Sequence, residues 1–367
     1  MQKTAAWPLA GIYAALIVYA SLYPFDHWRS QGVDWTAFLW APWPRYWTGF
    51  DVLANVLGYA PLGFIGVLAL RRSARHLPAV TVTVVAASLL SLVLESLQLF
   101  LPARVPSNVD WELNTLGALI GAALAWTLER FGFLDRWSRF RANWFFPDAR
   151  GALVLLALWP VALLFPAPVP LGLGQILERT EDALALWLQD TPWLDWLPVR
   201  EVELQPLLPI YEVLCVSMGQ LLPCMLAFTL IRHLHQKAIA WALLVGAGLS
   251  VTALSAALTY GPSHAWGWIN PPVQLGLLLA ALLALPLMWA REKTVQVLAL
   301  VGLVLQLTML NNASASAYFS LTLHNWEQGQ FIRFHGLIQW IGWLWPFVLL
   351  VYLMRRLSSS RPSKMGG

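Results

Sequence analysis

The sequence predicts an all-α fold: a polytopic transmembrane helical bundle of about ten spans with both termini in the cytoplasm. Composition is the first observation behind this prediction. The 367-residue chain is 58% hydrophobic and only 11% charged, whereas about 25% of the residues in an ordinary soluble domain are charged. The second is a series of apolar runs of roughly 17–25 residues, each long enough to cross about 30 Å of hydrocarbon. A soluble fold would have to bury all of these runs at once, and we exclude it.

Ten apolar segments account for the predicted spans, with ends placed to within a few residues. They cover residues 7–24, 51–70, 79–101, 111–129, 151–168, 207–231, 238–259, 272–290, 294–310 and 336–354. The first segment follows a single lysine and has no small-residue cleavage pattern at a suitable distance. We therefore expect an uncleaved span there rather than a signal peptide.

The distribution of basic residues sets the predicted orientation. If the N-terminus is cytoplasmic, all but six of the 23 Lys and Arg residues fall between spans on the inner side. The six exceptions are Arg29, Arg45, Arg104, Arg179, Arg200 and Arg333. Cytoplasmic loops of membrane proteins carry an excess of Lys and Arg, so both termini are predicted inside. The pI near 9.2 is then explained by basic side chains beside anionic membrane lipids, and no nucleic-acid partner is required.

Three long segments are predicted on the outer side. Residues 25–50 are rich in tryptophan, and residues 169–206 contain a stretch with apolar and acidic residues on opposite helical faces. Indole rings favour the head-group level of a bilayer, and an amphipathic helix favours its surface. Together with residues 311–335, for which a partly re-entrant segment stays open, these segments are interpreted as membrane-surface anchors, with a ligand lid as the alternative. Membrane lipids are the expected partners.

The chain is predicted to divide at residues 132–150, which mix arginine with aromatic residues. We expect a four-helix membrane domain over 1–131, a cytoplasmic basic and aromatic loop over 132–150 and a second transmembrane bundle of about six helices over 151–354. Residues 355–367 form a basic cytoplasmic tail. No Cys or His spacing typical of a metal site occurs, so neither a metal nor another cofactor is expected. The sequence does not indicate an oligomeric state.

A repeated motif carries most of the functional information. Residues 51–58 and residues 110–117 both read Asp-x-x-x-Asn-x-Leu-Gly, 59 positions apart. Within each copy the Asp and Asn are spaced i, i+4 and share one helical face. Between the copies lies an apolar segment with two polar residues near its end, followed by an arginine. The candidate functional residues are Asp51, Asn55, Glu95, Gln98, Arg104, Asp110 and Asn114.

These seven side chains are predicted to meet in one layer near the outer surface. Asn55 and Asn114 lie one turn into spans that run inward, and Gln98 lies near the end of a span that runs outward, so all three reach roughly 5–8 Å below the outer boundary. Polar groups are costly in hydrocarbon, which makes such a cluster a candidate functional site. The small residues Gly58, Gly63, Gly117 and Gly121 are expected to allow close approach of the helices that carry the motif.

A purely structural interpretation of the same residues stays open. Asp51 and Asp110 stand at predicted helix starts, where aspartate is a favoured N-cap. Amide side chains join transmembrane helices through hydrogen bonds worth about 0.6 kcal/mol each. Glu95 needs a partner at its predicted depth, and an ion pair with Arg104 would close the bundle without any ligand.

The stretch from Asp51 to Gly121 resembles the VanZ-like family of bacterial membrane proteins. The residues that carry the resemblance, in matching order and spacing, are Asp51, Asn55, Pro61, Gly63, Glu95, Gln98, Arg104, Asp110, Asn114, Gly117 and Gly121. The resemblance is limited to about residues 11–131. Many members have further acids between the arginine and the second aspartate, where this chain has Ser107, Asn108 and Val109. That departure argues against a metal site in the loop.

The resemblance implies an integral membrane protein of the bacterial cytoplasmic (inner) membrane, in a family named for resistance to the lipid-bearing glycopeptide teicoplanin. The partner is predicted from the residues themselves: an acid, amide and arginine cluster just under the outer surface, flanked by tryptophan-rich segments, favours an amphiphile of the outer leaflet. This amphiphile is either a lipid-linked cell-envelope precursor or a lipophilic glycopeptide antibiotic. Arg104 would meet a phosphate or carboxylate, and the amides would hydrogen-bond sugar or peptide groups. A role in envelope biogenesis or glycopeptide resistance follows from this interpretation.

Two other functions are compatible with the sequence. A membrane enzyme acting on a lipid-linked substrate would use Glu95 and Asp110 as general acid and base. A lipid or small-molecule transporter or flippase would account for the repeated helices and for Pro61 within a span. No nucleophile elbow, metal-spaced His set or phosphate-binding glycine loop is present. We therefore expect binding rather than catalysis, and expect no catalytic residues.

Overall fold

The protein is described here from a computed structural model, over residues 6–23, 25, 27–34, 36–43, 49–73, 78–147, 149–165, 167–196, 207–313 and 332–359. These residues form helices and loops with no strand, apart from one isolated bridge between Phe145 and Ile231. The predicted all-α class is confirmed. The chain folds into two compact units, Met1–Phe140 (unit 1) and Arg141–Gly367 (unit 2). Each unit is described by itself.

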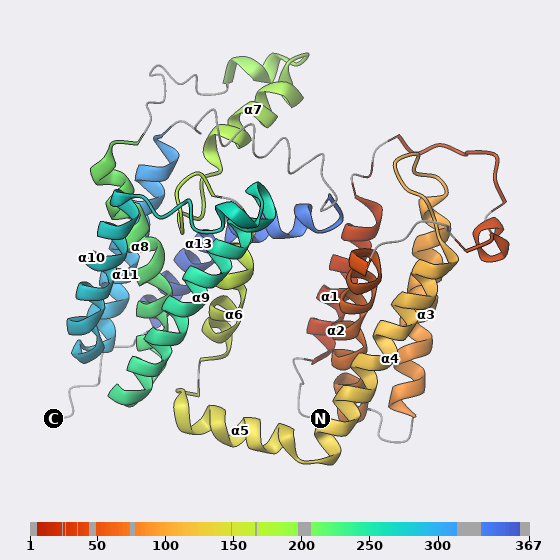
Figure 1. The fold of residues 1–367 in the computed structure, drawn as a ribbon, viewed down its shortest axis with the longest axis horizontal. Helices are drawn as coiled ribbons and strands as arrows, with labels where there is room; N and C mark the ends of the chain where they lie inside the picture. Colours follow the sequence, from red (N-terminus) through yellow and green to blue (C-terminus); the bar gives the residue numbers. More distant parts are fainter. Residues whose placement is uncertain are drawn as a thin grey trace. The chain divides into compact units, whose positions relative to one another are not determined.

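Unit 1 is a bundle of four long helices (Figure 1). They are α1 (Ala6–Leu22), α2 (Gly49–Ser73), α3 (Ala79–Gln98) and α4 (Asn108–Arg130), with a short 3-10 helix η1 (Ala37–Trp40) in the first long connection. A further helix, α5 (Phe133–Trp144), follows α4. The segment 132–150 was expected as a loop, and α5 corrects that expectation for most of its length.

Unit 1 is held together by unusually close packing of α2 against α4. A Cβ atom added at Gly117 would overlap the backbone carbonyl of Val56, and one at Gly121 would overlap that of Ala60. Residue numbers increase in the same direction along both helices, from Val56 and Gly117 to Ala60 and Gly121, so α2 and α4 run parallel. At their far ends Arg71 Nε lies 2.6 Å from Glu129 Oε2. Small residues permit this backbone-to-backbone contact between membrane helices.

The predicted glycine contacts are only partly correct. Gly63 contributes as expected, because its Cβ would overlap the carbonyl of Ala118. Gly58 does not, because a Cβ there would meet open space. Its carbonyl oxygen instead accepts a hydrogen bond of 3.0 Å from the hydroxyl of Tyr13 on α1.

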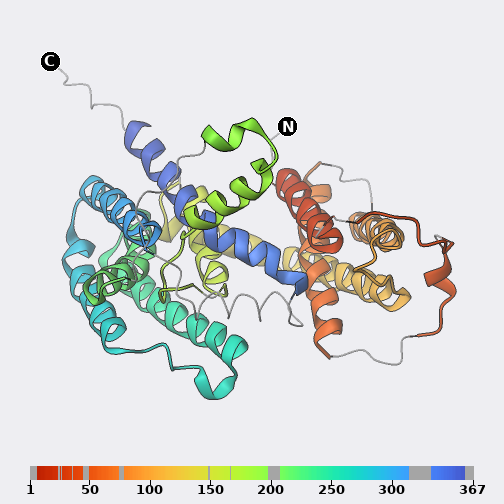
Figure 2. The same ribbon diagram turned by 90° about the horizontal axis from the view of Figure 1, so that it is seen from above.

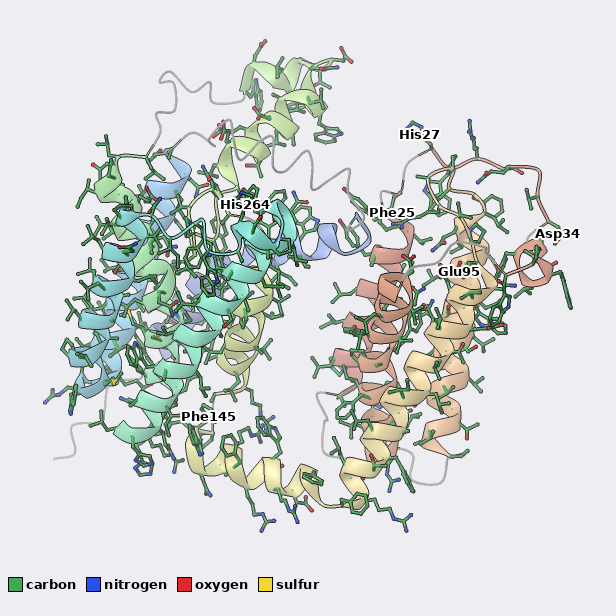
Figure 3. All side chains as sticks on the ribbon, viewed as in Figure 1. Phe25, His27, Asp34, Glu95, Phe145 and His264 are labelled. Carbon is green, nitrogen blue, oxygen red and sulfur yellow. The ribbon has the colours of Figure 1, made fainter. Side chains whose placement is uncertain are left out.

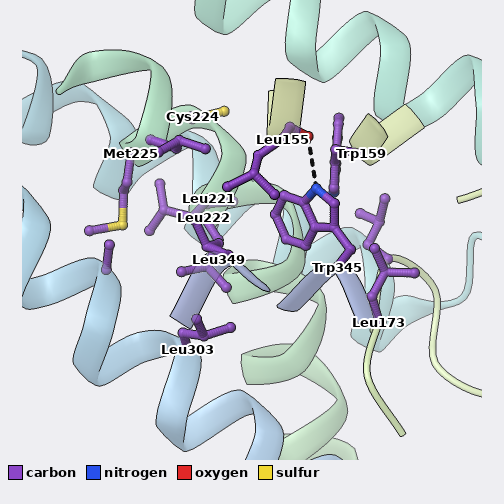
Figure 4. Close-up of a cluster of buried hydrophobic side chains, with 14 of the residues drawn as sticks. Leu155, Trp159, Leu173, Leu221, Leu222, Cys224, Met225, Leu303, Trp345 and Leu349 are labelled. Atoms are coloured by element: carbon purple, nitrogen blue, oxygen red, sulfur yellow. Dashed lines mark hydrogen bonds between the residues drawn. The ribbon is translucent and has the colours of Figure 1, made fainter. Parts of the chain in front are cut away.

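Unit 2 is built around helix α8. Its helices are α6 (Arg150–Ala162), α7 (Leu177–Leu188), α8 (Pro209–Phe228), α9 (Leu234–Tyr260), α10 (Pro271–Trp289), α11 (Glu292–Asn311) and α13 (Ile332–Ser359), with 3-10 helices η2 (Pro192–Trp196) and η3 (Pro262–His264). Helix α8 contacts α6, α9, α10 and α11, and α10 and α11 flank it in both views (Figures 1 and 2). In the core, Trp345 Nε1 donates a 2.8 Å hydrogen bond to the carbonyl of Leu155 (Figure 4).

Each of the ten predicted spans overlaps one helix, and seven of these helices are long and apolar enough to cross a membrane by length and composition. Helix α4 meets that criterion only together with α5 as a bent pair, while α1 and α6 are shorter apolar helices. Several membrane-spanning helices are therefore present, whereas a count of ten and cytoplasmic termini stay predictions. The expected amphipathic helix within 169–206 is α7, and most of the segment 311–335 lies outside the described residues.

Replacing Gly121 by leucine should force α2 and α4 apart. The added side chain meets the backbone of α2, which cannot rotate away, and overpacking of this kind costs about 1–3 kcal/mol. We expect a clearly lower unfolding temperature of the purified protein in detergent. The matched control is Gly58→Leu, because Gly58 lies on the same pair of helices but faces open space. Equal unfolding temperatures for the two variants would contradict this view of the α2–α4 contact.

Candidate functional site

All seven candidate residues lie at one end of the unit 1 bundle. At this end, which we call the rim end, α1 and α3 finish at Leu22 and Gln98 while α2 and α4 begin at Gly49 and Asn108. Asp51 and Asn55 stand in the first turns of α2, Asp110 and Asn114 in the first turns of α4, Glu95 and Gln98 in the last turn of α3, and Arg104 in the following connection. Glu95 marks this end of α3 in Figure 3.

The two copies of the repeated motif are joined directly. Asn55 Nδ2 donates a 2.7 Å hydrogen bond to Asp110 Oδ1, so the amide of the first copy contacts the acid of the second. Both side chains are half-buried. Hydrogen bonds with an ionised partner are shorter and stronger than those between neutral groups. Asp51 lies one turn before Asn55 on α2 and is also half-buried.

Asn114 joins α4 to α3 one turn deeper. Its Nδ2 donates a 2.9 Å hydrogen bond to the hydroxyl of Ser91, which is fully buried. Tyr59 on α2 is hydrogen-bonded to the same serine. The second polar atom of Asn114, Oδ1, is buried and has no hydrogen-bond partner among the described residues. An unsatisfied buried acceptor costs about 1–3 kcal/mol, so this oxygen is a place where a polar group of a ligand or a water would be stabilised.

Glu95 is buried at the rim end, with 4% of its surface exposed. Its Oε2 accepts a 3.0 Å hydrogen bond from the backbone N–H of Ser107. Ser107 is the N-cap of α4, and its hydroxyl accepts from the backbone N–H of Asp110 at 3.4 Å. The carboxylate of Glu95 therefore stands at the positive end of the α4 dipole. The N-cap role suggested for Asp110 belongs to Ser107, while the ion pair between Glu95 and Arg104 stays a prediction.

Arg104 and Gln98 hold the end of α1. The guanidinium of Arg104 donates to the carbonyl of Tyr23 through Nε at 3.0 Å and Nη2 at 2.6 Å, and to the carbonyl of Ala20 at 3.1 Å. Gln98 Nε2 donates to the carbonyl of Ser21 at 3.2 Å. The last carbonyls of a helix have no partner within the helix. Arg104 and Gln98 supply these partners for α1 from α3 and the connection that follows it.

Sequence reasoning missed three residues of this site: Tyr59, Ser91 and Ser107. The signal for two of them was present, because Tyr59 continues the face of Asn55 by four residues and Ser91 precedes Glu95 by four. Among the described residues no group of three or more His, Cys, Asp or Glu side chains could hold a metal ion. The site offers acids, amides and hydroxyls, which is a donor and acceptor set for a polar organic group.

The fold and the site together define a multi-pass helical membrane protein with a polar cluster at one end of its first bundle. Residues 7–129 match the family model described as VanZ/LLP1, so this segment of the chain is similar to the VanZ-like family. The resemblance predicted from the repeated motif is thereby confirmed over that third of the chain, and residues 130–367 lie outside the match. Comparisons with curated proteins and with solved structures gave no match.

Replacing Arg104 by alanine should destabilise unit 1 through the end of α1. The variant loses three charge-assisted hydrogen bonds to the carbonyls of Ala20, in α1, and Tyr23, just after it, and loss of such a bond costs about 1.5–3 kcal/mol. A lower unfolding temperature and faster proteolysis near residue 23 are expected. Arg29→Ala is the control, because Arg29 is exposed in the loop at the same end. An Arg104→Ala protein as stable as the control would show that these bonds contribute little.

Proposed function

We propose that the rim end of unit 1 binds the polar head group of an amphiphile in the outer leaflet of a bacterial cytoplasmic membrane. The ligand class is a lipid-linked cell-envelope precursor or a lipophilic glycopeptide antibiotic. The observation that carries the proposal is the buried Oδ1 of Asn114, which has no hydrogen-bond partner among the described residues and lies one turn from the Asp110 carboxylate. A sugar hydroxyl or a peptide N–H is the complementary donor.

The contacts divide the seven residues into two roles. Asp51, Asn55, Asp110 and Asn114 lie on the two parallel helices of the repeat and are the ligand-facing set. Arg104 and Gln98 position the end of α1 through its backbone carbonyls, and Glu95 positions the start of α4 through the backbone of Ser107. In this proposal Arg104 shapes the site instead of contacting the anionic group of the ligand, the role its charge suggests from sequence.

The proposal that the site lies on the outer side of the membrane is supported by the distribution of basic residues. Arg71 and Arg130 stand at the opposite ends of α2 and α4 from the motif. Basic residues concentrate on the cytoplasmic side, which puts the rim end on the outer side. There the site would be open to the outer leaflet, where lipid-linked wall precursors are displayed and where lipophilic glycopeptides act. A role in envelope biogenesis or glycopeptide resistance would follow from capture of such a molecule.

Mass spectrometry of lipids and glycans that co-purify with the full-length protein tests the proposal. Asp110→Asn removes the charge but keeps an oxygen for Asn55, and Asn114→Leu removes the unpartnered acceptor at similar volume. We expect each change to reduce the bound amphiphile at least about tenfold, equivalent to about 1.4 kcal/mol.

The control is Glu112→Gln, because Glu112 is exposed in the first turns of α4 and loses the same charge two residues away. The amount of bound amphiphile is compared only among variants with the same unfolding temperature as the wild type, and with equal amounts of protein. Equal recovery of the amphiphile from the wild type, Asp110→Asn and Asn114→Leu would overturn the proposal. Loss of folding in every cluster variant, with no separable loss of ligand in the folded fraction, would assign the cluster to helix locking alone.

A further inference from the structure

Unit 2 contains a cavity of about 350 Å³ that no part of the VanZ-like match covers. Its wall comes from the end of α6 and the turn after it, the first turn of α8, the last turns of α9 and the connection from α9 to α10. The volume falls within the roughly 300–1,000 Å³ range of small-molecule sites. His264, in η3 directly after α9, is one of the lining residues and is labelled in Figure 3.

The lining combines apolar and aromatic walls with a few polar groups. Phe165, Leu171 and Trp268 contribute large apolar surfaces. Aromatic walls with few, well-placed polar groups are typical of sites for small organic ligands. Aromatic faces also attract cations, with energies of about 0.5–2 kcal/mol. The polar groups therefore decide which ligand the cavity fits.

Glu212 supplies the acidic group of the cavity. Asn270 Nδ2 donates a 2.9 Å hydrogen bond to Glu212 Oε1. The same asparagine caps α10, because its Oδ1 accepts from the backbone N–H of Val273 at 2.9 Å. The two bonds fix the orientation of the amide, so Glu212 is held by a neutral donor. Neither lysine nor arginine is found among the described residues that line the cavity, which leaves the charge of Glu212 available to a cationic ligand.

A second polar group lies further along α9. The hydroxyl oxygen of Thr252 is buried and has no hydrogen-bond partner in the described part of the chain. The neighbouring hydroxyl of Ser255 is occupied, because it donates a 2.9 Å hydrogen bond to the carbonyl of Leu164. Thr252 is eight residues from the end of α9 at Tyr260, or about 12 Å along the helix axis. A ligand that spans the cavity could meet Glu212 at one end and Thr252 at the other.

We propose that this cavity binds an ammonium group, primary or quaternary, on a small amphiphilic or zwitterionic molecule. The ammonium pairs with Glu212 against the aromatic wall, and a hydroxyl or ester oxygen further along the ligand bonds with Thr252. The ammonium belongs either to a lipid head group, such as that of phosphatidylethanolamine, or to a free amine such as ethanolamine or choline. This site is separate from the rim-end site of unit 1 and does not depend on its function.

Binding measurements on the full-length protein in detergent test the proposal with two arms. Native mass spectrometry compares phosphatidylethanolamine with phosphatidylglycerol, which has no ammonium, and calorimetry titrates ethanolamine and choline. We expect the wild type either to bind phosphatidylethanolamine at least tenfold better than phosphatidylglycerol or to bind ethanolamine or choline measurably, and the arm that responds identifies the source of the ligand. Failure of both arms would overturn the proposal.

Variants connect the binding to the cavity. Glu212→Gln should reduce binding of the preferred probe at least tenfold, and Thr252→Val should reduce it several-fold. Asp182→Asn is the matched charge control, because Asp182 is an exposed acid of α7 in the same unit. If Glu212→Gln fails to fold, Ala256→Phe, which fills the cavity from its wall, replaces it with the same expected loss. Wild-type affinity in the folded variants would refute the site, and Glu112→Gln, at an exposed acid of α4 in unit 1, should leave this binding unchanged.

Discussion

The close approach of α2 and α4 is the constraint on which the rest of unit 1 depends. Glycines at 63, 117 and 121 bring the two backbones into direct contact, and a contact of this kind admits only one register. That register sets Asn55 beside Asp110 and carries Asn114 to Ser91 on α3. A membrane bundle gains little from the hydrophobic effect between its helices, because lipid tails are as apolar as leucine. Packing and hydrogen bonds must supply the stability, and in unit 1 both are concentrated where the repeated motif begins.

The rim end combines residues with structural contacts and residues that we propose bind the ligand. The side chains of Arg104, Gln98 and Glu95 hydrogen-bond to backbone groups at helix ends. Without these bonds the backbone groups would lie unsatisfied in a poorly hydrated region. These contacts hold the ends of α1 and α3 and the start of α4 in place. The acids and amides on α2 and α4, which we propose face the ligand, then stand on a rigid support, which a binding site requires.

The sequence predicted the helices well because the length of an apolar run reports a membrane helix directly, and each of the ten segments overlaps a helix. The direction of the predicted spans also placed Asn55 and Asp110 at the same end of the bundle, as the structure shows. The partners of Arg104 could not be foreseen, because backbone carbonyls some 80 residues away leave no mark in the sequence. Gly58 and Gly63 look equivalent in the sequence of this span, and only the crossing of the helices decides which one touches α4. The cavity of unit 2 combines four segments without any motif.

A single buried polar atom without a hydrogen-bond partner is weak evidence for a ligand-binding site. Gln220 Oε1 is such an atom in the interior of unit 2. Asn114 and Thr252 differ from it in their surroundings, because one lies beside the Asp110 carboxylate and the other faces a cavity that also contains Glu212. The Thr252 hydroxyl has no hydrogen-bond partner among the described residues, so the cost of its burial is offset only when something in the cavity bonds to it.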